Sequence, residues 1–162
     1  KYAINGGNVQ KSRQHEAKAR IHNGGNCEAD ARIEGKKVTA FIDANIIVKA
    51  FTRNKDREKC RDVLYEDFVT DTLCLVEAQH AIYAISGDRI HASDSVKSLL
   101  RTGCLIVDLN RNLLFESFKR TGKYNLNTFD LIHYVAAMFN NCSELVSYDK
   151  DFDGLEIRRT EP

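Results

Sequence analysis

Long apolar segments are missing from this 162-residue sequence. Its most apolar stretches are short, such as Val38–Ile42, whereas a membrane helix needs about 20 consecutive apolar residues. No C-x-x-C pair occurs among the five cysteines, which argues against a zinc knuckle or a disulfide framework. No G-x-x-x-x-G-K-S/T loop occurs, which argues against a nucleoside triphosphatase. We therefore expect a cytoplasmic protein with reduced, mostly buried thiols.

Charge is unevenly distributed along the chain. Residues 1–37 contain eight Lys or Arg and four Asp or Glu, whereas the remainder has an excess of acidic residues, so that the net charge is +1. The length fits a single domain. We expect an N-terminal extension at 1–37, which either forms a basic arm for phosphates or a solvated polar segment, and a folded domain at 38–162.

Apolar strand-like segments alternate with helical patterns from Val38 onward. The expected strands are 38–42, 104–107, 145–147 and 155–159. The expected helices are 45–51, 56–67, 73–85, 93–101, 111–120 and 128–140. This order predicts the α/β class, with a central, mostly parallel sheet between two layers of helices. In such sheets, binding sites form at the carboxyl ends of the strands.

Four acidic residues are candidates for one site, and three of them lie at strand ends or helix starts that an α/β sheet brings together. Asp43 follows the first strand, and Asp149 follows the strand at 145–147. Asp130 lies in the first turn of a helix, and Glu77 lies in an otherwise apolar helical stretch. Each acid alone also fits an ordinary role, as a helix cap, a salt-bridge partner or a turn residue.

Carboxylates that converge on one point repel one another, and a divalent cation relieves that repulsion. Mg²⁺ and Mn²⁺ prefer oxygen ligands, and no cluster of His or Cys competes for a softer metal. Such ions can activate water against a phosphodiester. The four acids therefore predict a Mg²⁺ or Mn²⁺ site that acts on a phosphate ester.

The order of the motifs around these acids resembles the PIN-domain family. The matching segments are Phe41–Ile47, Leu75–Ala78, Asn127–Ala137 and Leu145–Phe152. The resemblance implies a three-layer α/β/α sandwich and a Mg²⁺- or Mn²⁺-dependent endoribonuclease that leaves a 5′-phosphate and a 3′-hydroxyl. It implies that the metal is held by Asp43, Glu77, Asp130 and Asp149, with support from Asn45, Ser147 and the accessory acid Asp151.

Size and single-domain form resemble the toxin branch of this family, which implies an RNA substrate, a small antitoxin partner and a homodimer. A ribosome-maturation type RNA-processing nuclease and a non-catalytic RNA-binding module remain alternatives. A haloacid-dehalogenase-like phosphatase requires the motif Asp-x-Asp after the first strand. This chain has Asp43-Ala44-Asn45 there, which argues against such a phosphatase. We expect His133 to pack or contact substrate rather than act as a general base, and Tyr134 and Tyr148 to pack or to stack on bases.

Overall fold

The structure is a computed structural model, and it describes residues 40–162. The expected extension at 1–37 lies outside the described residues, so the boundary between it and the domain at 38–162 stays a prediction. Within the described part, no helix is both long enough and apolar enough to cross a membrane.

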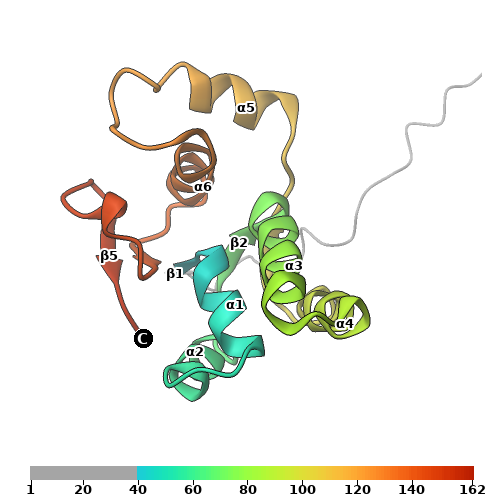
Figure 1. The fold of residues 1–162 in the computed structure, drawn as a ribbon. Coiled ribbons are helices and arrows are strands. Elements are labelled where there is room, and N and C mark those ends of the chain that lie inside the picture. Colours follow the sequence, from blue (N-terminus) through green and yellow to red (C-terminus); the bar gives the residue numbers. More distant parts are fainter. Residues whose placement is uncertain (1–39) are drawn as a thin grey trace, which may run out of the picture. The chain divides into compact units, whose positions relative to one another are not determined.

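Five short strands form one parallel sheet (Figure 1). The strands are β1 (Ala40–Ile42), β2 (Val69–Asp71), β3 (Leu105–Val107), β4 (Glu144–Val146) and β5 (Arg158–Thr160). They are arranged in the order β3-β2-β1-β4-β5. Phe41 of β1 lies opposite Val69 on one side and Leu145 on the other. Because every pairing is parallel, all five carboxyl ends lie at one edge of the sheet.

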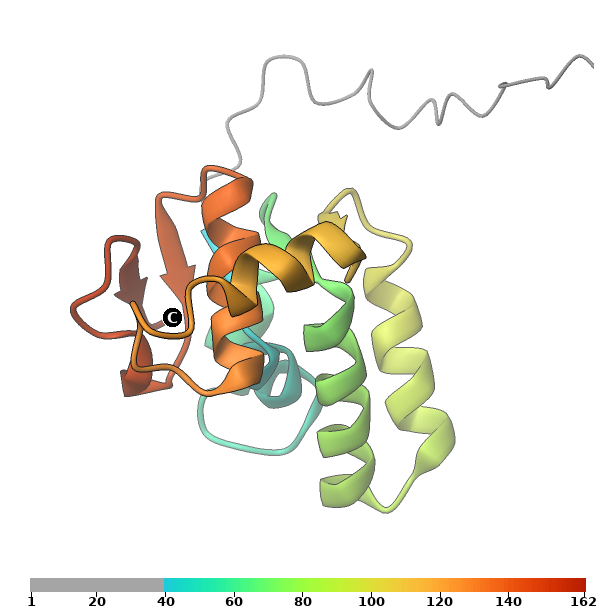
Figure 2. The same cartoon turned by 90° about the horizontal axis from the view of Figure 1, so that it is seen from above.

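Within residues 40–162, six α-helices connect the strands. They are α1 (Ala44–Phe51), α2 (Arg57–Val63), α3 (Thr72–Ser86), α4 (Arg89–Leu99), α5 (Arg111–Phe118) and α6 (Thr128–Phe139), and a short 3-10 helix, η2, covers Lys150–Phe152. Figures 1 and 2 show α5 and α6 together on one side of the sheet and α1, α2 and α4 on the other. The helices therefore form the two outer layers that the sequence predicts.

Neighbouring residues of β1 enter two separate cores. Phe41 packs in one apolar cluster with residues of α6 and α5, including Tyr134 and Leu113. Ile42 packs in the other cluster with residues of α1 and α2, including Ile46. Side chains of a strand point alternately to its two faces, so β1 is covered on both faces, as its apolar sequence predicts.

Capping residues define the ends of three helices. Asn127 caps α6 by accepting hydrogen bonds from the backbone N–H groups of Phe129 and Asp130. Gly87 ends α3 with a φ of 70°, in the left-handed region that favours glycine. The helix expected at 93–101 begins earlier, at Arg89, because Asp88 caps α4.

Strand β2 is not among the strands expected from the sequence, because Thr70-Asp71-Thr72 is a polar stretch that suits the start of a helix. Asp71 does cap α3, but Val69–Asp71 also pairs with β1 and β3. The helix expected at 56–67 is shorter, ending at Val63. Four cysteines lie in the described part as free thiols, and three of them are buried, as predicted.

Candidate active site

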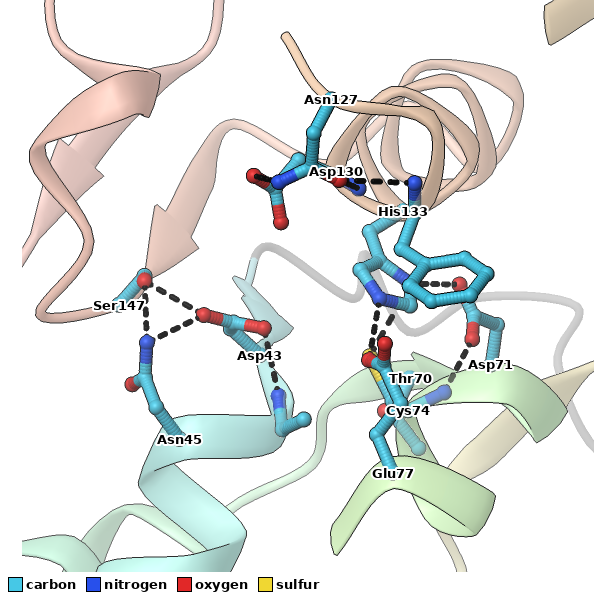
Figure 3. Close-up of polar contacts among 12 residues, drawn as sticks. Asp43, Asn45, Thr70, Asp71, Cys74, Glu77, Asn127, Asp130, His133 and Ser147 are labelled. Carbon is cyan, nitrogen blue, oxygen red and sulfur yellow. Dashed lines mark hydrogen bonds and ion pairs between the residues drawn. The ribbon is translucent and has the colours of Figure 1, made fainter.

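Asp43 lies at the carboxyl end of β1, where it caps helix α1 (Figure 3). One carboxylate oxygen accepts a hydrogen bond from the Ala44 backbone N–H at 2.6 Å, and the other accepts from the Ser147 hydroxyl at 2.6 Å. The side chain is buried, with 6% of the residue exposed. Burial raises the pKa of Asp43, and the hydrogen bond from Ser147 only partly offsets this effect.

Asn45 and Ser147 hold the Asp43 side chain in place through hydrogen bonds. Asn45 lies in the first turn of α1, and Ser147 follows directly after β4. The Asn45 amide nitrogen donates to Asp43 Oδ2 at 2.5 Å and to Ser147 Oγ at 2.9 Å. Its amide oxygen accepts from the Tyr148 N–H, and Ser147 Oγ accepts from the Asp149 N–H. These bonds tie the end of β1 to the end of β4, so the carboxylate of Asp43 is held in one orientation.

Asp130 and Asp149 approach each other from α6 and from the segment after β4. Carboxylate oxygens of Asp130, Asp149 and Asp151 lie within 4.8 Å of one another. Burial raises the pKa of Asp130 to about 6, and the negative charges of Asp43 and Asp149 add to the effect. Asp151 is exposed, whereas Asp130 and Asp149 are partly buried.

Glu77 lies in the second turn of α3 and meets a partner that the sequence did not suggest. Its Oε2 atom lies 2.8 Å from Nε2 of His133, and its side chain is 30% exposed. Glu77 also adds to the negative charge that raises the pKa of Asp43. The charged carboxylate in an apolar helix does have a partner, as its burial requires, and the partner is a histidine rather than a Lys or Arg.

Asp71 completes this arrangement, although it is not among the site residues expected from the sequence. Its Oδ2 atom lies 2.8 Å from Nδ1 of His133, and its Oδ1 atom accepts from the Cys74 N–H. Cys74 Sγ lies 3.3 Å from the same imidazole nitrogen. All three side chains are buried. Asp71 lies at the end of β2, and this position at a strand end could have identified it as a site residue. Strand β2 is not among the strands expected from the sequence, so this signal was not recognised.

The charge of His133 follows from its surroundings. Burial lowers its pKa, but the contacts with Cys74, Asp71 and Glu77 outweigh burial and raise the pKa well above the usual value. Burial raises the pKa of the Cys74 thiol to about 12, so the thiol is neutral near pH 7. The two carboxylates therefore supply the negative charge that keeps both ring nitrogens protonated. Burial also agrees with the expectation that His133 packs.

The donor set fits a hard divalent cation. Asp43, Asp130 and Asp149 offer only oxygen ligands, and within residues 40–162 no Lys or Arg forms an ion pair with any of them. Burial is the main cause of the raised pKa values of Asp43 and Asp130, and the negative charges of neighbouring carboxylates add to it. Mg²⁺ and Mn²⁺ are the ions that carboxylate oxygens select.

The two tyrosines noted in the sequence have different surroundings. Tyr134 is fully buried, and its hydroxyl donates to Glu156 at 2.8 Å. Tyr148 is partly buried, and the Lys49 ammonium lies 4.5 Å from its ring centroid. Tyr134 therefore packs in the core and cannot stack on a base.

Comparison with known proteins identifies the family and the fold. The sequence profile of the PIN domain matches residues 40–157. No curated protein sequence matches the chain. Solved structures with the same fold include VapC20 of Mycobacterium tuberculosis, described as a toxin that cleaves the sarcin–ricin loop. This chain superposes on it with a TM-score of 0.62 at 14% identity, over 74% of this chain and 99% of that one.

Two further structures are similar to this chain. A toxin–antitoxin complex from Klebsiella pneumoniae gives a TM-score of 0.61 at 15% identity, over 75% of this chain and 97% of that one. VapBC2 from Rickettsia felis, bound to a DNA fragment from its promoter, gives a TM-score of 0.57 at 17% identity, over 76% of this chain and 98% of that one. The three-layer fold that the sequence predicts is therefore confirmed.

Proposed function

The chain belongs to the PIN domain family, and from this premise we propose that it is a metal-dependent endoribonuclease. The observation that carries the proposal is the convergence of Asp43, Asp130 and Asp149 at one edge of the sheet, with Glu77 close enough to influence Asp43. Such a group of carboxylates, which have no paired Lys or Arg in the part of the chain that the structure describes, fits a site for Mg²⁺ or Mn²⁺.

Each residue has a distinct part in the proposed reaction. When bound, the divalent cation supplies an activated water and stabilises charge on the phosphodiester. Asp43, Asp130 and Asp149 hold the cation, directly or through water. Glu77 binds the cation or orients the water beside it. Asn45 and Ser147 keep Asp43 in place through the hydrogen bonds at 2.5 and 2.6 Å. Asp151 is an accessory acid at the exposed side.

The experiment that tests this proposal uses fluorescent single-stranded RNAs of mixed sequence. The purified protein is incubated with Mn²⁺, with Mg²⁺ and with EDTA, beside the variant Asp43→Asn. Asp94→Asn is the matched control, because Asp94 is an exposed acid of α4 that pairs with Lys97. We expect metal-dependent cleavage by the wild type and by the control only. RNA binding without cleavage by all three proteins would instead identify a binding module.

We further propose that the protein is the toxin of a toxin–antitoxin pair. A groove of about 550 Å³ lies between α1 and α3, and its lining includes Asn45, which holds Asp43, and the acid Glu77. Val48, Ala81 and Ile85 give it an apolar lining, which fits the apolar face of an amphipathic helix. A basic side chain of that partner would compensate the acids at the end of the groove.

Co-expression with the small protein encoded next to this one tests the toxin assignment. The pair should co-purify, and the partner should inhibit cleavage. Ala81→Glu should abolish co-purification without loss of cleavage, because it places a charge in the groove. If no such neighbour exists, an RNA-processing role is favoured.

We also propose that the protein forms a homodimer. Phe115 and Phe118 lie three residues apart on α5, and both are exposed, so they form one apolar patch on the helix surface. Light scattering should show a dimer for the wild type and a monomer for Phe115→Glu.

A further inference from the structure

We propose that Asp71 and His133 form a buried pair that positions Glu77 in the active site. The inference rests on the proposed function, because it assigns these two residues a role toward the same metal centre. Neither residue needs to touch the ion or the RNA. His133 is a positioning residue that acts through Glu77, and Asp71 acts through His133.

The hydrogen bonds form one continuous chain from the sheet to the acid (Figure 3). Asp71 is the last residue of β2, and its Oδ1 atom is held by the Cys74 N–H at 2.7 Å. Its Oδ2 atom lies 2.8 Å from His133 Nδ1, and His133 Nε2 lies 2.8 Å from Glu77 Oε2. The two ring nitrogens of His133 therefore connect the fixed carboxylate of Asp71 to the more mobile carboxylate of Glu77.

The imidazole cannot easily turn away from these partners. His133 is 1% exposed and Asp71 is fully buried. The ring lies 6.3 Å from the ring of Phe41, between centroids. A buried side chain in a packed core keeps one rotamer, so the position of Nε2 is set by the core.

Glu77, in contrast, needs an external constraint. Its side chain is 30% exposed, and it lines the groove between α1 and α3. A free glutamate side chain has several accessible rotamers, and ordering it costs up to about 2 kcal/mol. His133 is its only hydrogen-bond partner among the described residues. Without that donor, the carboxylate could turn into the groove and away from Asp43.

Helix spacing explains why two helices are enough to build this arrangement. Asp130 and His133 are three residues apart on α6, and Cys74 and Glu77 are three residues apart on α3. Residues at this spacing share a helix face. Each helix therefore presents one acid to the metal site and, one turn away, one residue of the buried cluster. Partners of this kind, which contact ligands rather than the metal, typically change metal affinity 10–100-fold when they are mutated.

Two histidine variants test the proposal. The Asn side chain can reproduce the Nδ1 donor to Asp71 but cannot reach Glu77, whereas Gln can reproduce the Nε2 donor. We measure Mn²⁺ affinity of the full chain by electron paramagnetic resonance, without RNA. We expect His133→Asn to weaken Mn²⁺ binding about 10–100-fold and His133→Gln to weaken it clearly less, because Gln keeps the donor to Glu77 and loses only the donor to Asp71.

Two further comparisons separate positioning from general stability. Tyr134→Phe is the matched control, because Tyr134 is buried on the same helix and loses hydrogen bonds with Glu156 and Ile157. It should lower the melting temperature but leave Mn²⁺ affinity unchanged. In a Glu77→Ala background, His133→Asn should have no further effect on affinity, since the residue through which it acts is gone.

Each outcome decides the question. Equal affinities for the Asn and Gln variants, or an undiminished effect of His133→Asn in the Glu77→Ala background, would overturn the positioning role and leave the nuclease proposal standing. If the wild type itself binds no Mn²⁺, the proposed metal site is refuted and the positioning role is refuted with it.

If circular dichroism shows that the histidine variants are unfolded, Asp71→Asn replaces them, since its Oδ1 can still cap α3. It should weaken Mn²⁺ binding only when Glu77 is present, and weakening without Glu77 would refute the proposal.

Discussion

Replacing Asp130 by Asn should stabilise the metal-free protein while removing its activity. Burial, followed by the charges of Asp43 and Asp149, raises the pKa of Asp130 from 3.8 to about 6. Between these two pH values the folded state holds a proton that the unfolded state has lost. The free energy of unfolding therefore falls as pH rises through this window, and it stays lower above pH 6. Asn carries no charge, so the free energy of unfolding of the variant does not fall in this way as the pH rises.

The size of the effect follows from the shift. Two pKa units correspond to about 3 kcal/mol, and partial exposure of Asp130 to solvent reduces this to about 1–2 kcal/mol. The variant also loses a negative charge in the first turn of α6, which contributes about 0.3–1 kcal/mol. The net gain in the free energy of unfolding is therefore about 1 kcal/mol, or a rise of about 2–4 °C in melting temperature.

Calorimetric melting in EDTA measures this difference, and it suits a chain that contains no tryptophan. At pH 7.5 Asp130→Asn should melt above the wild type, and the difference should disappear below about pH 4. Adding Mg²⁺ should reverse the order, because the ion stabilises the folded wild type more than the variant. A variant that melts below the wild type in EDTA at pH 7.5 would show that the charge of Asp130 is compensated and would refute the argument.

Three further substitutions test other parts of the structure through urea unfolding followed by circular dichroism. Ser147→Ala should lower the free energy of unfolding by about 1–3 kcal/mol, because Asp43 loses a buried donor; an unchanged midpoint would contradict this. Asp88→Ala removes the cap of α4 and should cost about 0.5–2 kcal/mol, with RNA cleavage retained as the control. Ile46→Ala empties a fully buried position and should cost about 2–5 kcal/mol; a smaller loss would mean that the core closes around the cavity.

Local sequence signals predicted the elements that depend on local chemistry. The strand ending before Asp43 and the helix capped by Asn127 both have strong apolar patterns, and both lie where expected. Strand β2 could not be identified this way, because Thr70 is polar although it is fully buried. Its hydroxyl donates to the Ile42 carbonyl at 3.0 Å, and that partner comes from a neighbouring strand which the local sequence does not reveal.

The start of α4 and the partner of Glu77 were missed for related reasons. Gly87 ends α3 and Asp88 caps α4, so the connection between the two helices is shorter than the expected bounds, 73–85 and 93–101, imply. The contact between Glu77 and His133 spans 56 positions in the chain, and it exists only because α3 and α6 meet. Helix spacing predicted which face each residue occupies, but which faces meet is decided by the whole fold.

The position of β4 in the sheet has a consequence for when the protein becomes active. β4 lies beside β1, and Ser147 reaches Asp43 across 104 positions of the chain. During synthesis, Asp43 and Glu77 are made long before Asp130 and Asp149. Until β4 joins β1, the early acids lack the neighbours with which they bind an ion. Under the proposed function, a growing chain thus stays harmless to the ribosomal RNA around it, and cleavage begins only once the last part of the domain has been made and folded.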